Sequence, residues 1–217
     1  AWSQEKAATS ERIRAEECVP VRIPRRKQDD LVIASDEFCK PQTTVEGLAK
    51  LRPAFRKDGG TVTAGNASGL NDGAVALLVA NGTAIQQQGW TPLARIVSSA
   101  VVGVEPRIMG IGPVEASNRA LERAELTLAD MDVIELNEAF AAQALACIRA
   151  WGLADDDPRI NPHGGAIALG HPLGMTGGRI LLSAARELQR SNKRYALVTL
   201  CIGVGQGYAV VLEREAP

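Results

Sequence analysis

The chain has 217 residues, of which 46% are hydrophobic and 23% charged, which is ordinary globular composition. Its 24 Lys and Arg against 25 Asp and Glu leave a net charge of -1, so no charge excess favours nucleic acid or an anionic membrane as partner. Four scattered cysteines and two histidines make a zinc site or a disulfide framework unexpected, and reduced thiols in a cytoplasmic protein fit best.

The first 60 residues are predicted to form a polar region that mixes helix and strand. The expected elements are a helix at 3–17, strands at 18–23 and 31–33, and a helix at 43–51. A capping-box pattern from Thr43 to Glu46 marks the start of the last helix, and Pro53 follows its end. The chain opens on Ala1 in helical sequence, which predicts that a natural N-terminus, with any targeting signal, lies upstream.

From residue 61 onward, apolar strands alternate with helices. The expected strands are 74–80 and 94–102, both buried, then 133–136, 195–200 and 208–212. The expected helices are 83–89, 113–124, 139–151 and 181–189, with a cap-like pattern at 127–130. This alternation predicts an α/β protein, and the last two strands are close enough in sequence to pair as an antiparallel hairpin.

One cysteine stands at the end of a predicted strand. Cys201 follows an apolar run and precedes glycines at 203, 205 and 207. Glycines at alternate positions clear one side of the loop, so that a ligand or another backbone can approach closely. A thiol there can act as a nucleophile or a proton shuttle, and a buried structural cysteine before a glycine hairpin is the alternative.

Two further segments carry polar side chains next to small residues. His171 lies in the glycine-rich run 164–178, where an imidazole can act as a base or bind an oxyanion, or else be a satisfied core histidine. Asn137 stands where a strand gives way to a helix, so it can cap the helix or hold a water. Glu138 can cap the helix, or orient Asn137 or His171.

Three motifs, at residues 137–140, 170–172 and 201–207, resemble in order the C-terminal active-site motifs of the thiolases, the acyl-CoA:acetyl-CoA C-acyltransferases. Residues 62–73 resemble the CoA-contacting segment of that family. The resemblance implies an α/β thiolase-like fold, with a mixed β-sheet, layered helices and part of the family's loop domain. Details such as the Cys-Ile-Gly-Val-Gly-Gln-Gly form of the last motif resemble the 3-oxoadipyl-CoA type most closely.

The resemblance also implies roles for individual residues, with CoA and acyl-CoA as substrates and neither cofactor nor metal. His171 would activate a nucleophilic cysteine, and Cys201 would exchange the α-proton of acetyl-CoA. Asn137 would hold a water, and the Gly203 N–H would join an oxyanion site. The residues implied to contact CoA are Ala64, Ser68, Phe140 and Lys40, the last in place of a frequent arginine.

The family's nucleophilic cysteine belongs to an N-terminal half, and the chain is predicted to be the C-terminal portion only, inactive alone. The expected parts are 1–65 (latter part of a CoA-covering loop domain), 66–90 (end of the N-terminal core domain) and 91–217 (C-terminal domain). The expected partners are CoA thioesters, the missing N-terminal half, and further copies in a homodimer or homotetramer, without nucleic acid or membrane. The alternative is a non-catalytic CoA- or lipid-binding module with the same fold.

Overall fold

The fold is organised around one mixed β-sheet. The computed structural model describes residues 1–215, and its central sheet has the strand order β3-β6-β5-β4. The strands are β3 (Ala94–Gly103), β4 (Val133–Leu136), β5 (Tyr195–Ile202) and β6 (Gln206–Arg214). β6 pairs antiparallel with β3 and with β5, whereas β4 and β5 are parallel. The predicted α/β class and the predicted C-terminal hairpin are confirmed.

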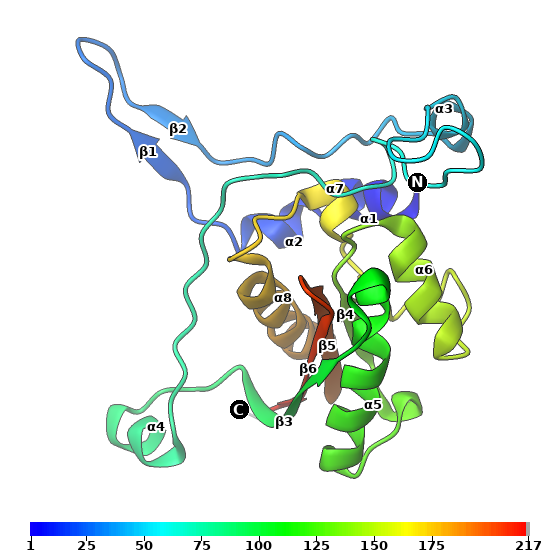
Figure 1. The fold of residues 1–217 in the computed structure, drawn as a ribbon. Coiled ribbons are helices and arrows are strands. Elements are labelled where there is room, and N and C mark those ends of the chain that lie inside the picture. Colours follow the sequence, from blue (N-terminus) through cyan, green and yellow to red (C-terminus); the bar gives the residue numbers. More distant parts are fainter. Residues whose placement is uncertain (216–217) are drawn as a thin grey trace.

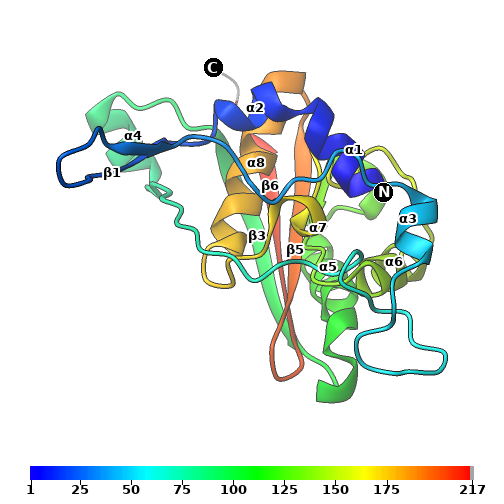
Figure 2. The ribbon, with the colours of Figure 1, turned by 90° about the horizontal axis from the view of Figure 1, so that it is seen from above.

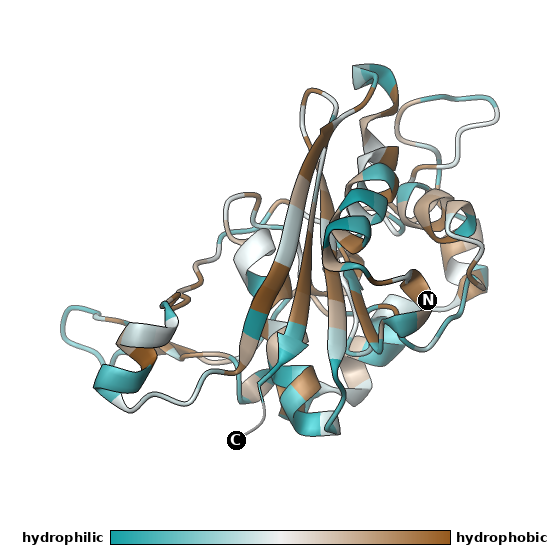
Figure 3. Ribbon diagram, turned by 90° about the horizontal axis from the view of Figure 1, so that it is seen from below, coloured by the Kyte–Doolittle hydropathy of each residue, from teal (hydrophilic) through white to brown (hydrophobic). Residues whose placement is uncertain are grey.

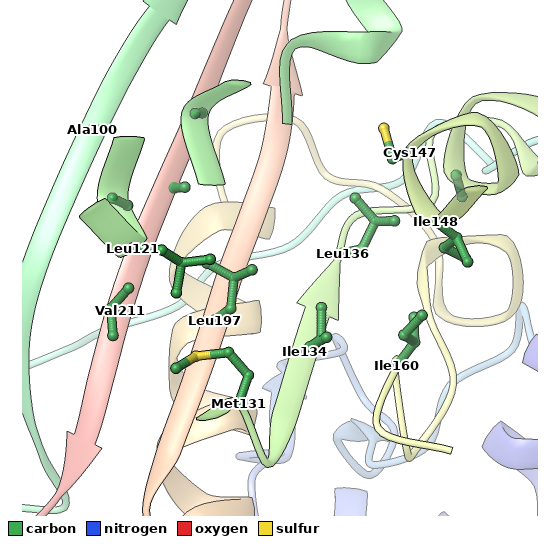
Figure 4. Close-up of a cluster of buried hydrophobic side chains, with 14 of the residues drawn as sticks. Ala100, Leu121, Met131, Ile134, Leu136, Cys147, Ile148, Ile160, Leu197 and Val211 are labelled. Carbon is green, nitrogen blue, oxygen red and sulfur yellow. The ribbon is translucent and has the colours of Figure 1, made fainter. Parts of the chain in front are cut away.

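Helices cover both faces of this sheet (Figure 1). α5 (Gly112–Ala124) packs on one face and α8 (Thr176–Ser191) on the other. Because side chains alternate along a strand, Leu197 and Val211 enter the core beside α5, whereas Val198 enters the core beside α8. Figure 4 shows the first cluster, and Figure 3 shows how far hydrophobic residues dominate the strands. The segments 137–140 and 201–207 therefore begin from strands of a well-packed centre.

The remaining helices connect these layers or lie outside them. They are α1 (Trp2–Thr9), α2 (Glu11–Ala15), α3 (Val45–Ala49), α4 (Gly82–Gln88), α6 (Ala141–Ala150) and α7 (Ala166–Leu169), with 3-10 turns η1 (Pro106–Ile111) and η2 (Leu128–Asp130). The cap predicted at 127–130 is confirmed, since the Asp130 carboxylate accepts from the Thr127 N–H at 2.8 Å. Across residues 1–215, no helix has the length and apolar character needed to cross a membrane.

One part of the N-terminal region reaches away from the sheet. β1 (Val21–Ile23) and β2 (Leu31–Ile33) form an antiparallel hairpin, all six of whose residues are exposed. Figures 1 and 2 show this hairpin and α4 projecting from the body of the molecule. The short strands predicted here are confirmed, although each is three residues long.

Several predicted elements differ from the structure. Residues 74–80 run without strand pairing to any described residue, because an apolar run specifies extended backbone but not a partner. β3 is an edge strand, with Val101 53% exposed, so its predicted burial is wrong. Thr44, not Thr43, caps α3 by accepting from the Gly47 N–H at 3.1 Å. The glycine run also contains α7, which no apolar periodicity announced.

The turn between β5 and β6 carries local strain. Val204 has φ 66 and is 83% exposed, so its β-branched side chain has a left-handed backbone without gain from burial. We expect Val204→Asn to raise the free energy of unfolding by about 1 kcal/mol, because asparagine tolerates this conformation better. Urea denaturation measures the change, and Val101→Asn on β3 is the control at an ordinary φ. A lower stability of Val204→Asn would contradict the strain.

Candidate active site

Asn137 and Cys201 lie at one end of the sheet because their strands are parallel neighbours. Leu136 pairs with Thr199, and the Asn137 N–H donates to the Thr199 carbonyl at 3.0 Å. Adjacent strands are about 4.8 Å apart, so Asn137 lies beside the C-terminal end of β5, the end that carries Cys201. The topology thus brings the amide of Asn137 and the thiol of Cys201 to the same end of the sheet.

His171 joins this end of the sheet through a side-chain contact. Its Nε2 lies 3.3 Å from Asn137 Nδ2. Asn137 is 1% exposed, and its Oδ1 has no hydrogen-bond partner among residues 1–215. An unpaired buried acceptor is costly, so this oxygen suits a water or a ligand group that donates. Phe140, rather than Asn137, is the N-cap of α6, so the helix-capping interpretation of Asn137 is wrong.

The tautomer of His171 follows from its second contact. Thr176 Oγ1 donates its hydrogen to the Pro172 carbonyl at 3.0 Å, which leaves that oxygen as an acceptor for His171 Nδ1 at 2.7 Å. The imidazole proton therefore sits on Nδ1, and Nε2 presents its lone pair. That lone pair accepts from Asn137 Nδ2 and can accept a proton from a reacting group. His171 is half-buried, so it is reachable.

Burial keeps this imidazole neutral. Desolvation lowers the pKa of His171 below its ordinary value of 6.5, and the positive charge of Arg179 lowers it further. Arg179 lies on α8, where it pairs with the buried Glu135 of β4 at 3.4 Å. At neutral pH His171 is thus an unprotonated base, which agrees with the acceptor role of its Nε2.

The lowered pKa of His171 predicts a definite pH dependence. Below pH 6.5 the unfolded chain binds a proton that native His171 refuses, so this group lowers stability as the pH falls towards its folded pKa. Above pH 6.5 its contribution is constant. An NMR titration of the imidazole should give a pKa for His171 below 6.5. A pKa at or above that value would contradict the proposed burial and charge effects.

Cys201 carries its proton near neutral pH. Its side chain is half-buried, and burial raises the pKa of its thiol, so the sulfur is protonated near neutral pH. Burial also raises the pKa of Cys147 to about 12, and that of Cys18 is raised for the same reason. Cys147 donates to the Gly110 carbonyl at 3.3 Å, as a structural thiol does. Among residues 1–215, Cys201 makes no hydrogen bond to His171 or Asn137.

The glycines after Cys201 serve two different purposes. A side chain at Gly207 would overlap with the Gly112 carbonyl, and one at Gly205 would overlap with the Val104 carbonyl. Another backbone, not a ligand, therefore explains these two glycines. Gly203 differs, since a Cβ there would meet nothing within 4 Å. Open space therefore lies beside Gly203, and the oxyanion role of its N–H stays a prediction.

The residues predicted to contact CoA fall into two linked groups. Lys40 and Ala64 line one cavity of about 330 Å³. The Ser68 hydroxyl donates to the Ala139 carbonyl at 3.1 Å, next to Phe140. Ala67 joins the groups, because it lines the cavity and forms a β-bridge with Phe140. Within the described residues, no cluster of His, Cys, Asp and Glu could hold a metal ion.

The sequence interpretation missed residues that support His171. Asn71 Oδ1 accepts from the His171 backbone N–H at 3.2 Å, and Gly170 has no side chain to block it. Thr176 determines the tautomer of His171, as described above. Gly170, next to His171, indicated that another group approaches closely, but the sequence did not identify that group as Asn71.

Sequence models of both domains of one family match this chain. Residues 90–214 match the thiolase C-terminal domain, and residues 1–83 match the thiolase N-terminal domain. The 3-oxoadipyl-CoA/3-oxo-5,6-dehydrosuberyl-CoA thiolase of Escherichia coli is 59% identical over 207 residues, covering 95% of this chain and 51% of its own length. The chain spans about half the length of the curated relatives it matches.

Solved structures agree with these relatives. The acetyl-CoA acetyltransferase of Bacillus anthracis has a TM-score of 0.93 and 42% identity, covering 98% of this chain and 54% of its own. The human mitochondrial 3-ketoacyl-CoA thiolase in complex with CoA has a TM-score of 0.91 and 47% identity, covering 99% of this chain and 53% of its own. The predicted thiolase-like fold is confirmed.

One prediction needs correction. The match of residues 1–83 to the N-terminal domain shows that the chain carries sequence of both thiolase domains. The prediction of a C-terminal portion alone, and the inactivity drawn from it, is therefore not supported. The three motifs that carried the resemblance all lie in residues 137–207, which weighted the interpretation towards the C-terminal domain.

Proposed function

This chain belongs to the thiolase family, and we propose that it transfers acyl groups between CoA and the α-carbon of acetyl-CoA. The observation that carries the proposal is the pairing of Asn137 with His171, in which Nε2 is a free base and Asn137 Oδ1 is unpaired. A module that only bound CoA or lipid would need neither group, so the catalytic proposal is favoured.

In the thiolysis direction, a thiol attacks the 3-oxo carbon of the substrate and gives its proton to His171 Nε2, and the shortened acyl group becomes a thioester of that thiol and ends on CoA. The bond between the α-carbon and that carbon breaks, and its electron pair becomes the enolate of acetyl-CoA. The Cys201 thiol, which its raised pKa keeps protonated near neutral pH, then protonates the enolate carbon, and the proton held by His171 restores the Cys201 thiol. Two groups would stabilise negative charge on the thioester oxygens. One is a water held by Asn137 Oδ1, and the other is the N–H of Gly203.

The proposed substrate is 3-oxoadipyl-CoA, whose name appears in that of the Escherichia coli relative. The cavity lined by Lys40 and Ala64, together with Ser68 and Phe140, is the proposed CoA contact. We keep the division into 1–65, 66–90 and 91–217 as a proposal. The exposed apolar residues of β1 and β2 support association into a homodimer or homotetramer, which sedimentation can measure.

Steady-state thiolysis tests this function directly. The protein is supplied with CoA and either 3-oxoadipyl-CoA or acetoacetyl-CoA, and loss of the substrate is followed. We expect turnover of both, with a higher kcat/KM for 3-oxoadipyl-CoA. CoA binding without turnover of either substrate would favour the non-catalytic module instead.

A further inference from the structure

Glu138 has no role in the proposed chemistry, but its carboxylate links the segment of Asn137 to the segment that leads to His171. Glu138 follows Asn137 directly, and its side chain is half-buried. Its Oε2 accepts from Ser3 Oγ at 2.7 Å and from the Ile167 N–H at 3.2 Å. Its Oε1 accepts from Asn161 Nδ2 at 3.0 Å. The three donors come from α1, from the segment before the glycine run and from α7, so one side chain ties three separate parts of the chain.

The surroundings are shaped to admit this carboxylate. A Cβ at Gly165 would overlap with the Glu138 carboxyl group, so glycine is needed there. The Gly165 N–H donates to Ser3 Oγ at 2.9 Å, while that hydroxyl donates to Glu138. On its other side, α7 is held by Gln4, whose Nε2 donates to the Ile167 carbonyl at 3.1 Å. The start of α7 is therefore fixed by side chains rather than by packing alone.

One residue that contacts Glu138 lies close in sequence to His171, so this contact can affect where His171 is held. Ile167 precedes His171 by four residues, and Glu138 follows Asn137 by one. We propose that Glu138 is a positioning residue that holds the His171 segment against Asn137, and so maintains the contact between Asn137 Nδ2 and His171 Nε2. This inference rests on the proposed function for its catalytic consequence, but its structural part concerns only the orientation of the imidazole.

Because the contacts of Glu138 are all hydrogen-bond donors, a variant of equal size can test them. All three groups that contact Glu138 act as donors, so only an acceptor fits between them. Glu138→Gln keeps the size of the side chain but replaces one of the two acceptor oxygens with a donating NH2 group, so at least one of the donors loses its acceptor. Ser3→Ala is a milder second variant, because it removes only the hydroxyl between Glu138 and Gly165. The control is Glu122→Gln, an exposed carboxylate on α5.

Two readouts separate positioning from simple stability. The first is the set of imidazole ¹⁵N shifts of His171 at pH 7, and the second is the rate at which acetyl-CoA exchanges its α-protons in D₂O. We expect Glu138→Gln to shift the ¹⁵N signal of His171 Nε2, which loses the hydrogen bond from Asn137 while Thr176 keeps the proton on Nδ1, and to slow exchange by tenfold to on the order of a hundredfold. Ser3→Ala should change both in the same direction, and Glu122→Gln should change neither.

Each outcome decides the inference. Wild-type His171 signals in folded Glu138→Gln would overturn it, whatever happens to the melting temperature. If Glu138→Gln does not fold, unchanged His171 signals in Ser3→Ala would overturn it equally. If the wild-type protein exchanges no protons, the proposed function fails, while the ¹⁵N shifts still test whether Glu138 orients the imidazole.

Discussion

Replacing His171 by alanine is expected to lower kcat for thiolysis by about 1,000-fold while the protein stays folded. The reason is geometric as well as chemical. His171 Nε2 is the free base of the site, since Thr176 fixes the proton on Nδ1 and burial keeps the ring neutral. Without the imidazole, the attacking thiol has no acceptor for its proton, and Asn137 loses the partner that orients its amide.

The second histidine of the chain provides the matched control. His163 directly precedes the same glycine-rich run, but its ring contacts Ser10 at 3.0 Å and Glu187 at 2.6 Å, away from Asn137. We expect His163→Ala to lose stability and to keep kcat within about threefold of the wild-type value. Steady-state kinetics of both variants, with circular dichroism to confirm folding, make the comparison. Equal losses of kcat would contradict a specific role for His171.

Replacing Asn161 by alanine is expected to lower the free energy of unfolding by about 3 kcal/mol. Asn161 is 2% exposed and holds the free edge of β4 as a neighbouring strand would. Its Oδ1 accepts from the Leu136 N–H, and its Nδ2 donates to the Leu136 carbonyl, both at 2.9 Å. The variant leaves both backbone groups buried without partners, at about 1–3 kcal/mol each before relaxation.

A control separates these hydrogen bonds from backbone strain. Asn161 has φ 45, where alanine is disfavoured in any case. Asn192 has φ 55 at the C-terminal end of α8 and is exposed, so Asn192→Ala should cost only the strain, about 1 kcal/mol. Urea denaturation of both variants gives the difference. Equal losses would show that Asn161 matters only for its conformation.

The sequence predicted that individual site residues follow the ends of strands, but not which of those strands are neighbours. Asn137 and Cys201 each follow an apolar run, so their place at an edge of the sheet could be expected. Which edge they share depends on β4 and β5 being parallel neighbours, a pairing between residues far apart in sequence. The proposed hold of Glu138 on the His171 segment runs through α7, which no local pattern indicated, although an orienting role for Glu138 was among the expectations.

The glycines and residues 74–80 also show that local sequence does not identify partners that are distant along the chain. Alternate glycines after Cys201 indicated close approach, but the chain alone could not say that Gly112 is the neighbour of Gly207. Residues 74–80 have the apolar composition of a buried strand, yet they pair with no strand in the part of the chain that is described. Composition specifies which backbone conformations are favoured, and distant partners decide which of them become strands.

Exchange of the α-protons of acetyl-CoA in D₂O, followed by mass spectrometry, tests the central claim most directly. It isolates the proton transfer assigned to Cys201 from the formation and cleavage of the carbon–carbon bond. The proposed site predicts exchange by the wild-type protein and a loss of about 1,000-fold in Cys201→Ala, with Cys147→Ala close to wild type. Absence of exchange by the wild-type protein, or equal exchange by Cys201→Ala, would contradict the assignment of Cys201, His171 and Asn137 to one acyl-transfer site.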